Sequence, residues 1–290
     1  MHTNVGDQKM RRREALKLAV LGAGGAMSAA GQNWAMKPPA PAFHGLKIGL
    51  TSYTTRKLTY ERTLEELKGI RIEYISLKDV HLPLSSTREE RLAAKKKAED
   101  AGVKIMGVGV IYLKNDEAQI RHALQYAKDL GVPVATISPE RAALPAVEKA
   151  VKEMDIQVAI HNHGPRDKVW PSPLGVFDAV RGLDSRIGCC VDVGHTFLLG
   201  VDPVDALRKC APRLYGVHLK DLAAPQGPQD VEPHNVPVGT GVLDVVAMLR
   251  VLREIHFTQL AALEYEAEAE HPVRGMAESF GYLRGVLAAI

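Results

Sequence analysis

Short apolar runs alternate with amphipathic segments from Leu46 to the end of the chain. The runs that predict β-strands are 47–52, 73–78, 103–110, 134–138, 157–161, 187–192, 214–220 and 260–265. Helical spacing of apolar residues follows each run, at 60–69, 87–101, 117–130, 141–154, 173–181, 203–210, 242–255 and 274–287. Apolar strands separated by helices indicate a parallel sheet. Eight such units are typical of an α/β fold closed into a (β/α)8 TIM barrel.

Length and composition fit one large domain. The chain has 290 residues, of which 46% are hydrophobic, and a barrel of this kind needs about 250. We therefore predict a single barrel over residues 46–290. A doubly wound open sheet is the alternative, but its glycine-rich phosphate turn is missing after the first run. Residues 222–241 read as a long polar loop, and Gly239-Thr240-Gly241 within it as a plain turn.

The first residues of the chain have the layout of an export signal. A basic stretch containing Arg12 and Arg13 precedes a moderately apolar segment over 18–30, and either Ser28-Ala29-Ala30 or Asn33-Trp34-Ala35 could be the cleavage site. The pattern resembles a twin-arginine signal, which directs folded proteins across a membrane. We assign the signal to 1–35 and a proline-rich linker to 36–45, so we expect export, for example to the periplasm. The alternative is a disordered basic tail.

Charge and cysteine content narrow the class of protein. The net charge is +3, and several positive charges lie in the first seventeen residues, so the body carries no basic stripe that would bind nucleic acid. No run in the body is long enough to span a membrane. Cys189, Cys190 and Cys210 are too few for a disulfide framework, and the adjacent pair reads as buried thiols. The sequence leaves a homo-oligomer open.

Ionisable residues gather at the ends of the last four predicted strands. Side chains two apart on a strand share a face, and in a parallel barrel all strands end at one mouth. The residues concerned are His161 and His163, Asp192, His218 and Lys220, and Glu264 and Glu266. Burying so many charges without partners would be prohibitive. They could be solvated strand ends or ion pairs, but one bound divalent metal ion accounts for all four strands together.

The ligand types restrict the metal. His161, Asp192, His218 and Glu264 make a mixed nitrogen and oxygen set, which suits Mn, Co, Fe or Zn better than Ca. Lys78 and His81 follow the second strand and could bind substrate hydroxyls. His195, just beyond the turn after Asp192, is a further candidate for substrate binding.

Five motifs together resemble the sugar isomerase and epimerase family with the xylose isomerase-like barrel. They are Ala159-Ile-His-Asn-His-Gly-Pro165, Val191-Asp-Val-Gly-His-Thr196, Val217-His-Leu-Lys-Asp221, Val236-Pro-Val-Gly-Thr-Gly241 and Leu263-Glu-Tyr-Glu266. The resemblance implies that Asp192, His218 and Glu264 are metal ligands. Many members have Glu where this chain has His161, and Glu140 at the end of the fourth strand is the alternative source of that ligand.

The resemblance also implies a chemistry. A metal-held sugar carbonyl acidifies the neighbouring C–H bond, and proton abstraction gives a metal-held enediolate that leads to isomerisation, epimerisation or β-elimination of a keto-sugar. Glu264, His163, Lys220 and Glu266 are the candidates for proton transfer, and a small sugar or keto-sugar is the expected substrate. An abasic-DNA endonuclease shares this barrel, but the chain lacks a basic groove. A catalytically inactive barrel that binds a sugar or a partner protein is the remaining alternative.

Overall fold

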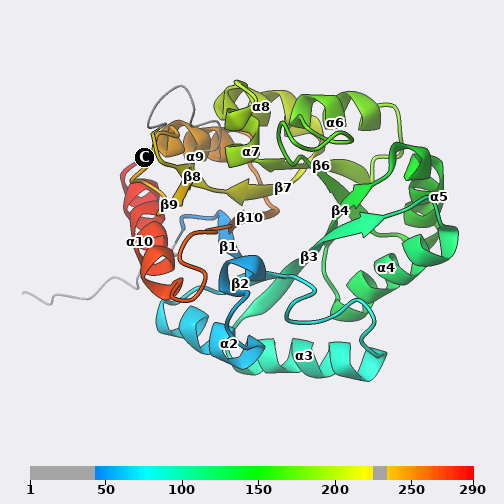
Figure 1. Cartoon of the computed structure of the whole chain (residues 1–290), viewed down its shortest axis with the longest axis horizontal. Coiled ribbons are helices and arrows are strands. Elements are labelled where there is room, and N and C mark those ends of the chain that lie inside the picture. Colours follow the sequence, from blue (N-terminus) through cyan, green and yellow to red (C-terminus); the bar gives the residue numbers. More distant parts are fainter. Residues whose placement is uncertain (1–42, 225–233) are drawn as a thin grey trace, which may run out of the picture. The chain divides into compact units, whose positions relative to one another are not determined.

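The computed structural model describes residues 43–224 and 234–290, which form a closed barrel of parallel strands (Figure 1). Neighbouring strands follow the order β1-β10-β7-β6-β5-β4-β3-β2. Their bounds are β1 Lys47–Thr51, β2 Tyr74–Leu77, β3 Lys104–Leu113, β4 Val134–Pro139, β5 Gln157–His161, β6 Ile187–Asp192, β7 Leu214–Leu219 and β10 Leu260–Leu263. The prediction of a (β/α)8 barrel is confirmed. The predicted signal over 1–35 lies outside the described residues.

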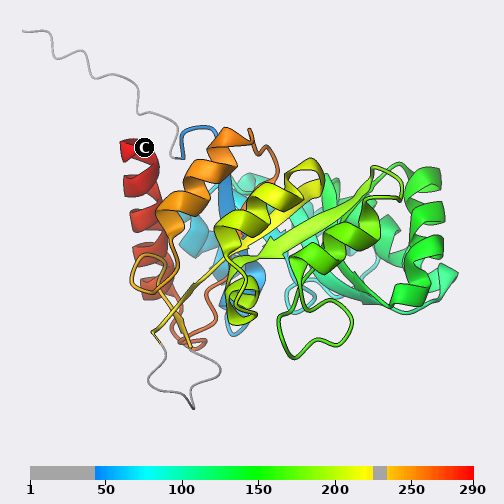
Figure 2. The same cartoon turned by 90° about the horizontal axis from the view of Figure 1, so that it is seen from above.

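Helices surround the barrel, as both cartoon views show (Figures 1 and 2). They are α2 Tyr60–Gly69, α3 Arg88–Asp100, α4 Glu117–Leu130, α5 Leu144–Met154, α6 Pro173–Val180, α7 Val193–Leu198, α8 Pro203–Cys210, α9 Val245–Glu254 and α10 Val273–Ala289. Short 3-10 turns lie at η1 Ser52–Thr55, η2 Arg141–Ala143 and η3 Ala211–Arg213. Among the described residues, no helix is both long and apolar enough to cross a bilayer.

Local sequence explains where several helices begin and end. Thr87 forms a capping box with Glu90 at the start of α3, and Asp202 caps α8, whose first residue is Pro203. Gly131 ends α4 in a left-handed conformation with φ of 69°, which costs glycine nothing. These residues set the helix ends because each one satisfies backbone groups that the helix itself leaves unpaired.

Several elements differ from the sequence prediction, among them helix α7, which starts directly after Asp192 where only a turn was predicted. β3 continues to Leu113 rather than ending at Val110, and its register against β4 shifts between Val108 and Ile111. The predicted loop over 222–241 contains β9 Asn235–Val236, which forms a small antiparallel pair with β8 Asp221–Leu222. The following helix starts at Val245 rather than at residue 242, because the side chain of Asp244 caps it.

The loop before α9 is fixed to the barrel by one buried carboxylate. Asp221 accepts hydrogen bonds from the backbone N–H groups of Leu222, Gly239, Gly241 and Leu243 at 2.9–3.1 Å. The amides of Gly239 and Gly241 are thus already used within the protein, which agrees with a plain turn rather than a phosphate-binding loop.

Candidate metal centre and active site

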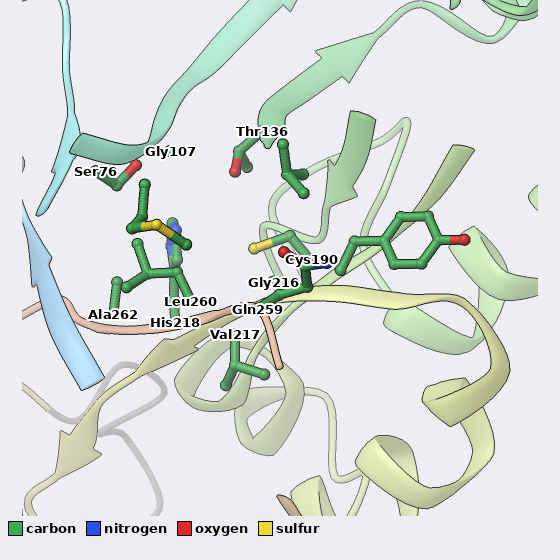
Figure 3. Close-up of a pocket in the computed structure, with 13 residues that line it drawn as sticks. Ser76, Gly107, Thr136, Cys190, Gly216, Val217, His218, Gln259, Leu260 and Ala262 are labelled. Atoms are coloured by element: carbon green, nitrogen blue, oxygen red, sulfur yellow. The ribbon is translucent and has the colours of Figure 1, made fainter. Parts of the chain in front are cut away.

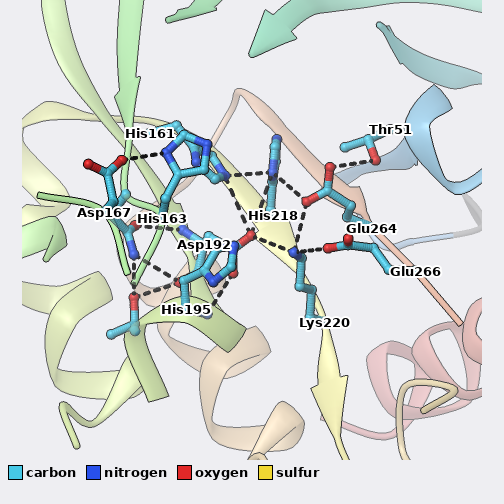
Figure 4. Close-up of polar contacts among 12 residues, drawn as sticks. Thr51, His161, His163, Asp167, Asp192, His195, His218, Lys220, Glu264 and Glu266 are labelled. Atoms are coloured by element: carbon cyan, nitrogen blue, oxygen red, sulfur yellow. Dashed lines mark hydrogen bonds and ion pairs between the residues drawn. The ribbon is translucent and has the colours of Figure 1, made fainter. Parts of the chain in front are cut away.

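Four buried residues meet at the mouth of the barrel, one from each of four neighbouring strands (Figure 4). His161 ends β5, Asp192 ends β6, His218 lies near the end of β7 and Glu264 follows β10. One potential ligand atom from each lies within 4.8 Å of those of the other three. Each residue is at most 7% exposed. We call these four residues the centre.

The two carboxylate oxygens of Asp192 have different surroundings. Its Oδ1 accepts a hydrogen bond from the backbone N–H of His195 at 2.8 Å and so caps α7. Its Oδ2 is buried and accepts no hydrogen bond in the described structure, although nitrogen atoms of Lys220 and His161 lie within ion-pair distance of it. Asn162, on the opposite face of β5 from His161, accepts a bond from the Asp192 N–H at 2.9 Å. The cap and this bond fix the carboxylate, so that Oδ2 is left for the centre.

Residues from β1 and β7, the two strands that neighbour β10, hold Glu264 in place. Thr51, at the end of β1, donates to its Oε1 at 3.2 Å, and its backbone N–H bonds to the carbonyl of Leu219 at 2.9 Å. Its Oε2 lies 3.2 Å from Nδ1 of His218. One oxygen is therefore a structural acceptor, while the other faces the centre.

The two imidazoles approach each other through ring nitrogens, with an angle of 52° between the ring planes. His161 Nε2 lies 2.9 Å from His218 Nδ1 and 3.4 Å from Asp192 Oδ2. Burial, together with the neighbouring His218, lowers the pKa of His161 well below its ordinary value. Burial opposes the charged form of His218 as well, but Cys190 and Glu264 outweigh it and raise that pKa. Without a metal, His218 is therefore the ring that favours the charged imidazolium form, while His161 favours the neutral form.

Lys220 brings a buried positive charge against the carboxylates. Its Nζ lies 3.2 Å from Asp192 Oδ2 and 3.0 Å from Glu264 Oε2, and it also donates to Glu266. Burial alone would lower the pKa of Lys220, but Asp192 and Glu264 raise it well above its ordinary value. Burial alone would raise the pKa of both acids, but Lys220 holds each of them well below its ordinary range.

The donor atoms and the charge of this cluster fit a divalent cation. Ligands at about 2.0–2.2 Å from one ion lie roughly 3–3.6 Å from each other. The nitrogen and oxygen atoms of the centre are separated by 2.9–3.8 Å where they are neighbours. Asp192, Glu264 and Glu266 are three anions, which in the metal-free protein face the cations of Lys220 and a protonated His218. The remaining negative charge, and an Asp192 Oδ2 that accepts no hydrogen bond, both favour a dication in place of the His218 proton.

A second group of side chains continues outward from the centre. The rings of His161 and His163 are 4.4 Å apart, and the ring of Tyr112 stacks on His163 at 5.7 Å. The Tyr112 hydroxyl lies 3.2 Å from His163 Nε2, and Asp167 Oδ2 lies 3.1 Å from its Nδ1. Burial lowers the pKa of His163, so it is a neutral imidazole held between two polar partners. The ring of His195 lies 6.0 Å from that of His163.

The other predicted substrate-binding residues lie apart from this group. Lys78 is half-buried at the end of β2, with Nζ 5.5 Å from the centroid of the Tyr53 ring. His81 folds back onto the start of α2, where its Nε2 lies 3.1 Å from the carbonyl oxygen of Leu58. Its contacts in the described structure are to residues outside the centre. A role of either residue in substrate binding stays a prediction.

Glu140 does not take the place of His161 in this geometry. It is exposed, and its carboxylate accepts a hydrogen bond from the backbone N–H of Asn115 at 3.1 Å. The four-residue group of the described chain is formed with His161 instead.

Sequence reasoning missed Tyr112 and Thr51. Tyr112 lies beyond the predicted end of the third strand, although Ile111-Tyr112-Leu113 continues its run of residues with high β-propensity. Thr51 is a polar residue at the last position of β1, and that position was a usable signal. Both residues contribute a hydroxyl group to the mouth of the barrel: Thr51 bonds to Glu264 and Tyr112 bonds to His163.

Comparisons with known proteins agree with this architecture. The model of the family described as xylose isomerase-like TIM barrel matches residues 65–286. No curated protein matches the chain. One similar solved structure is an uncharacterized protein from Parabacteroides distasonis, with 24% identity and a TM-score of 0.63, covering 83% of this chain and 99% of that one.

Two further solved structures are similar to this chain. A D-tagatose 3-epimerase-like protein has 16% identity and a TM-score of 0.67, with 84% of this chain and 98% of that chain covered. The IolI protein, whose structure has a bound zinc atom, has 14% identity and a TM-score of 0.71, with 84% and 99% covered. At these identities the likeness shows a shared fold.

Proposed function

Because the chain belongs to the xylose isomerase-like TIM-barrel family, we propose that it is a divalent-metal-dependent isomerase or epimerase of a sugar, or a lyase of a keto-sugar. The observation that carries the proposal is the buried centre, in which Asp192 Oδ2 accepts no hydrogen bond and lies among the other potential ligand atoms. The zinc atom of IolI and the D-tagatose 3-epimerase-like neighbour support the same class. The donor set is compatible with Mn, Co, Fe or Zn.

His161, Asp192, His218 and Glu264 would hold the ion. A bound dication polarises a carbonyl and so acidifies the C–H bond beside it. The protein must then remove and return a proton. Glu264 is the proposed base, because Thr51 and Lys220 fix its carboxylate and keep it ionised. A carboxylate held in this way spends no further entropy on orientation when the substrate arrives.

A second proton-transfer group lies across the mouth. His163 belongs to the β5 side of the centre and Glu264 to the β10 side, as Figure 4 shows. The His163 imidazole is neutral and about one fifth exposed, so it can take or give a proton at the substrate. Two such groups on different sides of one carbon are what epimerisation requires, while Lys220 and Glu266 can bind or protonate a neighbouring oxygen.

A solvent-exchange experiment tests the proposal directly. The protein is loaded with Mn, Co, Fe or Zn and incubated in deuterium oxide with a panel of aldoses, ketoses and 3-keto glycosides. We expect deuterium to appear at the carbon beside the carbonyl, and stoichiometric metal in the protein. Lack of metal together with lack of exchange would favour the inactive sugar-binding or partner-binding barrel instead.

We also propose that the protein is exported by the twin-arginine route, on the basis of residues 1–35. Replacement of Arg12 and Arg13 by lysine should then retain the chain, measured as a reporter fusion, in the compartment where it is made. Unchanged export of the variant would contradict this assignment.

A further inference from the structure

Cys190 lies one layer below the centre on the inner side of the barrel. It precedes Asp192 by two residues on β6, so both side chains have the same orientation on the strand. In the parallel register it pairs with His161 of β5 and Gly216 of β7. It is 1% exposed, and Figure 3 shows it among the side chains that line a cavity together with His218.

The thiol completes a second possible ligand set. The Cys190 sulfur and one ring nitrogen from each of His161 and His218 lie within 4.8 Å of one another. All three residues are buried. The imidazole pair therefore has carboxylates above it and a sulfur below it. We call Cys190, His161 and His218 the inner set.

The space around Cys190 permits a small adjustment. A methyl group added at Gly216 would come within 3.1 Å of the Cys190 sulfur, so the absent side chain is what makes room for the thiol. The adjoining cavity of about 20 Å³ is lined by Ser76, Thr136 and Cys190 among others. A volume of this size accommodates about one water molecule. This space leaves room for the thiol to change its rotamer toward an ion held by the two imidazoles.

The other thiols have a different environment. Cys189 points away from the barrel interior into the aliphatic core under the helices, and a hydrogen bond with Cys210, together with burial, raises its pKa well above the ordinary value. Cys210 itself lies 3.6 Å from the carbonyl oxygen of Pro173. Neither belongs to a group of potential ligands in the described residues. Cys189 is therefore a matched control for its neighbour.

We infer that the inner set binds a thiophilic cation through the Cys190 sulfur, so that the barrel offers an ion two overlapping positions that share the two imidazoles. The outer position, with two carboxylates, suits harder ions such as Mn²⁺. The inner position suits soft ions such as Cd²⁺ or Cu⁺, because thiolate is a soft ligand. The Cys190 sulfur forms its bond to the ion as the thiol proton passes to solvent. A soft ion drawn inward leaves the carboxylates and would block the outer position.

Binding of Cd²⁺ to the metal-free full chain tests this inference, with sulfur-to-cadmium charge-transfer absorption as the readout. We expect the band in the unaltered chain and in Cys189→Ala, and its loss in Cys190→Ser and Cys190→Ala. The Cd²⁺ affinity should fall by about tenfold or more in both Cys190 variants, while the Mn²⁺ affinity stays within about twofold. Normal Mn²⁺ binding also shows that a variant has folded.

Two results would overturn the inference: no charge-transfer band in the unaltered chain, or an equal band in Cys190→Ser. The inference extends the proposed function only through the shared histidines, and its test needs no turnover. A chain that binds Mn²⁺ and exchanges substrate protons but gives no cadmium band refutes the inner set alone. A chain with the band but without proton exchange refutes the proposed enzyme alone.

Discussion

The two halves of the barrel mouth differ in kind. β5, β6, β7 and β10 end in the ionisable residues of the centre and its neighbours, and we call them the charged half. β1 to β4, whose last residues are Thr51, Leu77, Leu113 and Pro139, contribute no member of the centre, and we call them the supporting half; Lys78 and Glu140 follow two of these strands but stay outside the four-residue group. Thr51 bonds across to Glu264, and Tyr112 bonds across to His163. The supporting half thus fixes the side chains through which the charged half would act.

Asp192→Asn should have the largest effect on the charged half. The amide keeps the shape but removes the charge at Oδ2, so metal affinity should fall by at least about 100-fold and proton exchange should be lost. Metal analysis and the deuterium assay measure this. Asp202→Asn is the matched control, since Asp202 also caps a helix but lies away from the centre. Full metal content in Asp192→Asn would show that the ligand set is wrong.

Lys220→Met should separate stability from metal binding. Removing the ammonium leaves buried carboxylates without their partner, so the free energy of unfolding of the metal-free protein should fall by about 3 kcal/mol in urea titrations. Metal affinity should rise, because the variant no longer places a cation beside the ion. Lys152→Met, which breaks an exposed ion pair, is the control and should leave the urea midpoint unchanged. Weaker metal binding in Lys220→Met would mean that Lys220 supports the ligands rather than competing with the ion.

The pKa of His161 is lowered and that of His218 is raised. These opposite shifts predict a pH optimum of stability in the metal-free protein. Below the ordinary histidine pKa of about 6.5, the unfolded chain protonates both rings while the native chain protonates only His218, because the pKa of His161 is lowered. Stability therefore increases with pH there. Above that value only the native chain retains a proton, on His218, and stability decreases again.

The contribution of the pair is obtained from urea midpoints of the unaltered chain and of a His161→Gln/His218→Gln variant across this pH range. The pKa values of His81 and His163 are also lowered, but these residues remain in both proteins and their contributions cancel. A difference curve without a maximum near pH 6.5 would contradict the opposite pKa shifts of His161 and His218.

Tyr112→Phe should give the smallest effect and tests the supporting half. Loss of one hydroxyl that bonds to His163 removes about 1 kcal/mol of interaction, so kcat/KM should fall roughly fivefold, with metal content unchanged. Tyr215→Phe is the control, because the Tyr215 hydroxyl bonds to the carbonyl of Ser185 rather than to the charged half. Equal rates for Tyr112→Phe and the unaltered chain would show that His163 is positioned by Asp167 alone.

Much of this arrangement follows from sequence periodicity. The alternation of strands and helices predicts the barrel, and the two-residue period of a strand predicts that His161, Asp192, His218 and Glu264 face one mouth. The stagger of the strands could not be read in the same way. It decides that Lys220 lies between Asp192 and Glu264, and the register shift in β3 accompanies the unexpected proximity of Tyr112 to His163. His81 turns back toward the start of α2 because its ring contacts the carbonyl oxygen of Leu58, and the spacing of residues along the chain does not predict this contact.

Glu264 and its neighbours are held by residues from the opposite end of the barrel sequence. Thr51 donates to its carboxylate, Thr54 accepts from the Tyr265 N–H and Arg56 donates to the Glu266 carbonyl, across more than 200 residues of chain in each case. During synthesis three members of the centre are therefore present long before the fourth is made. A nascent chain would offer an ion only an incomplete site, and the proposed metal binding would reach full affinity only after β10 has paired with β1.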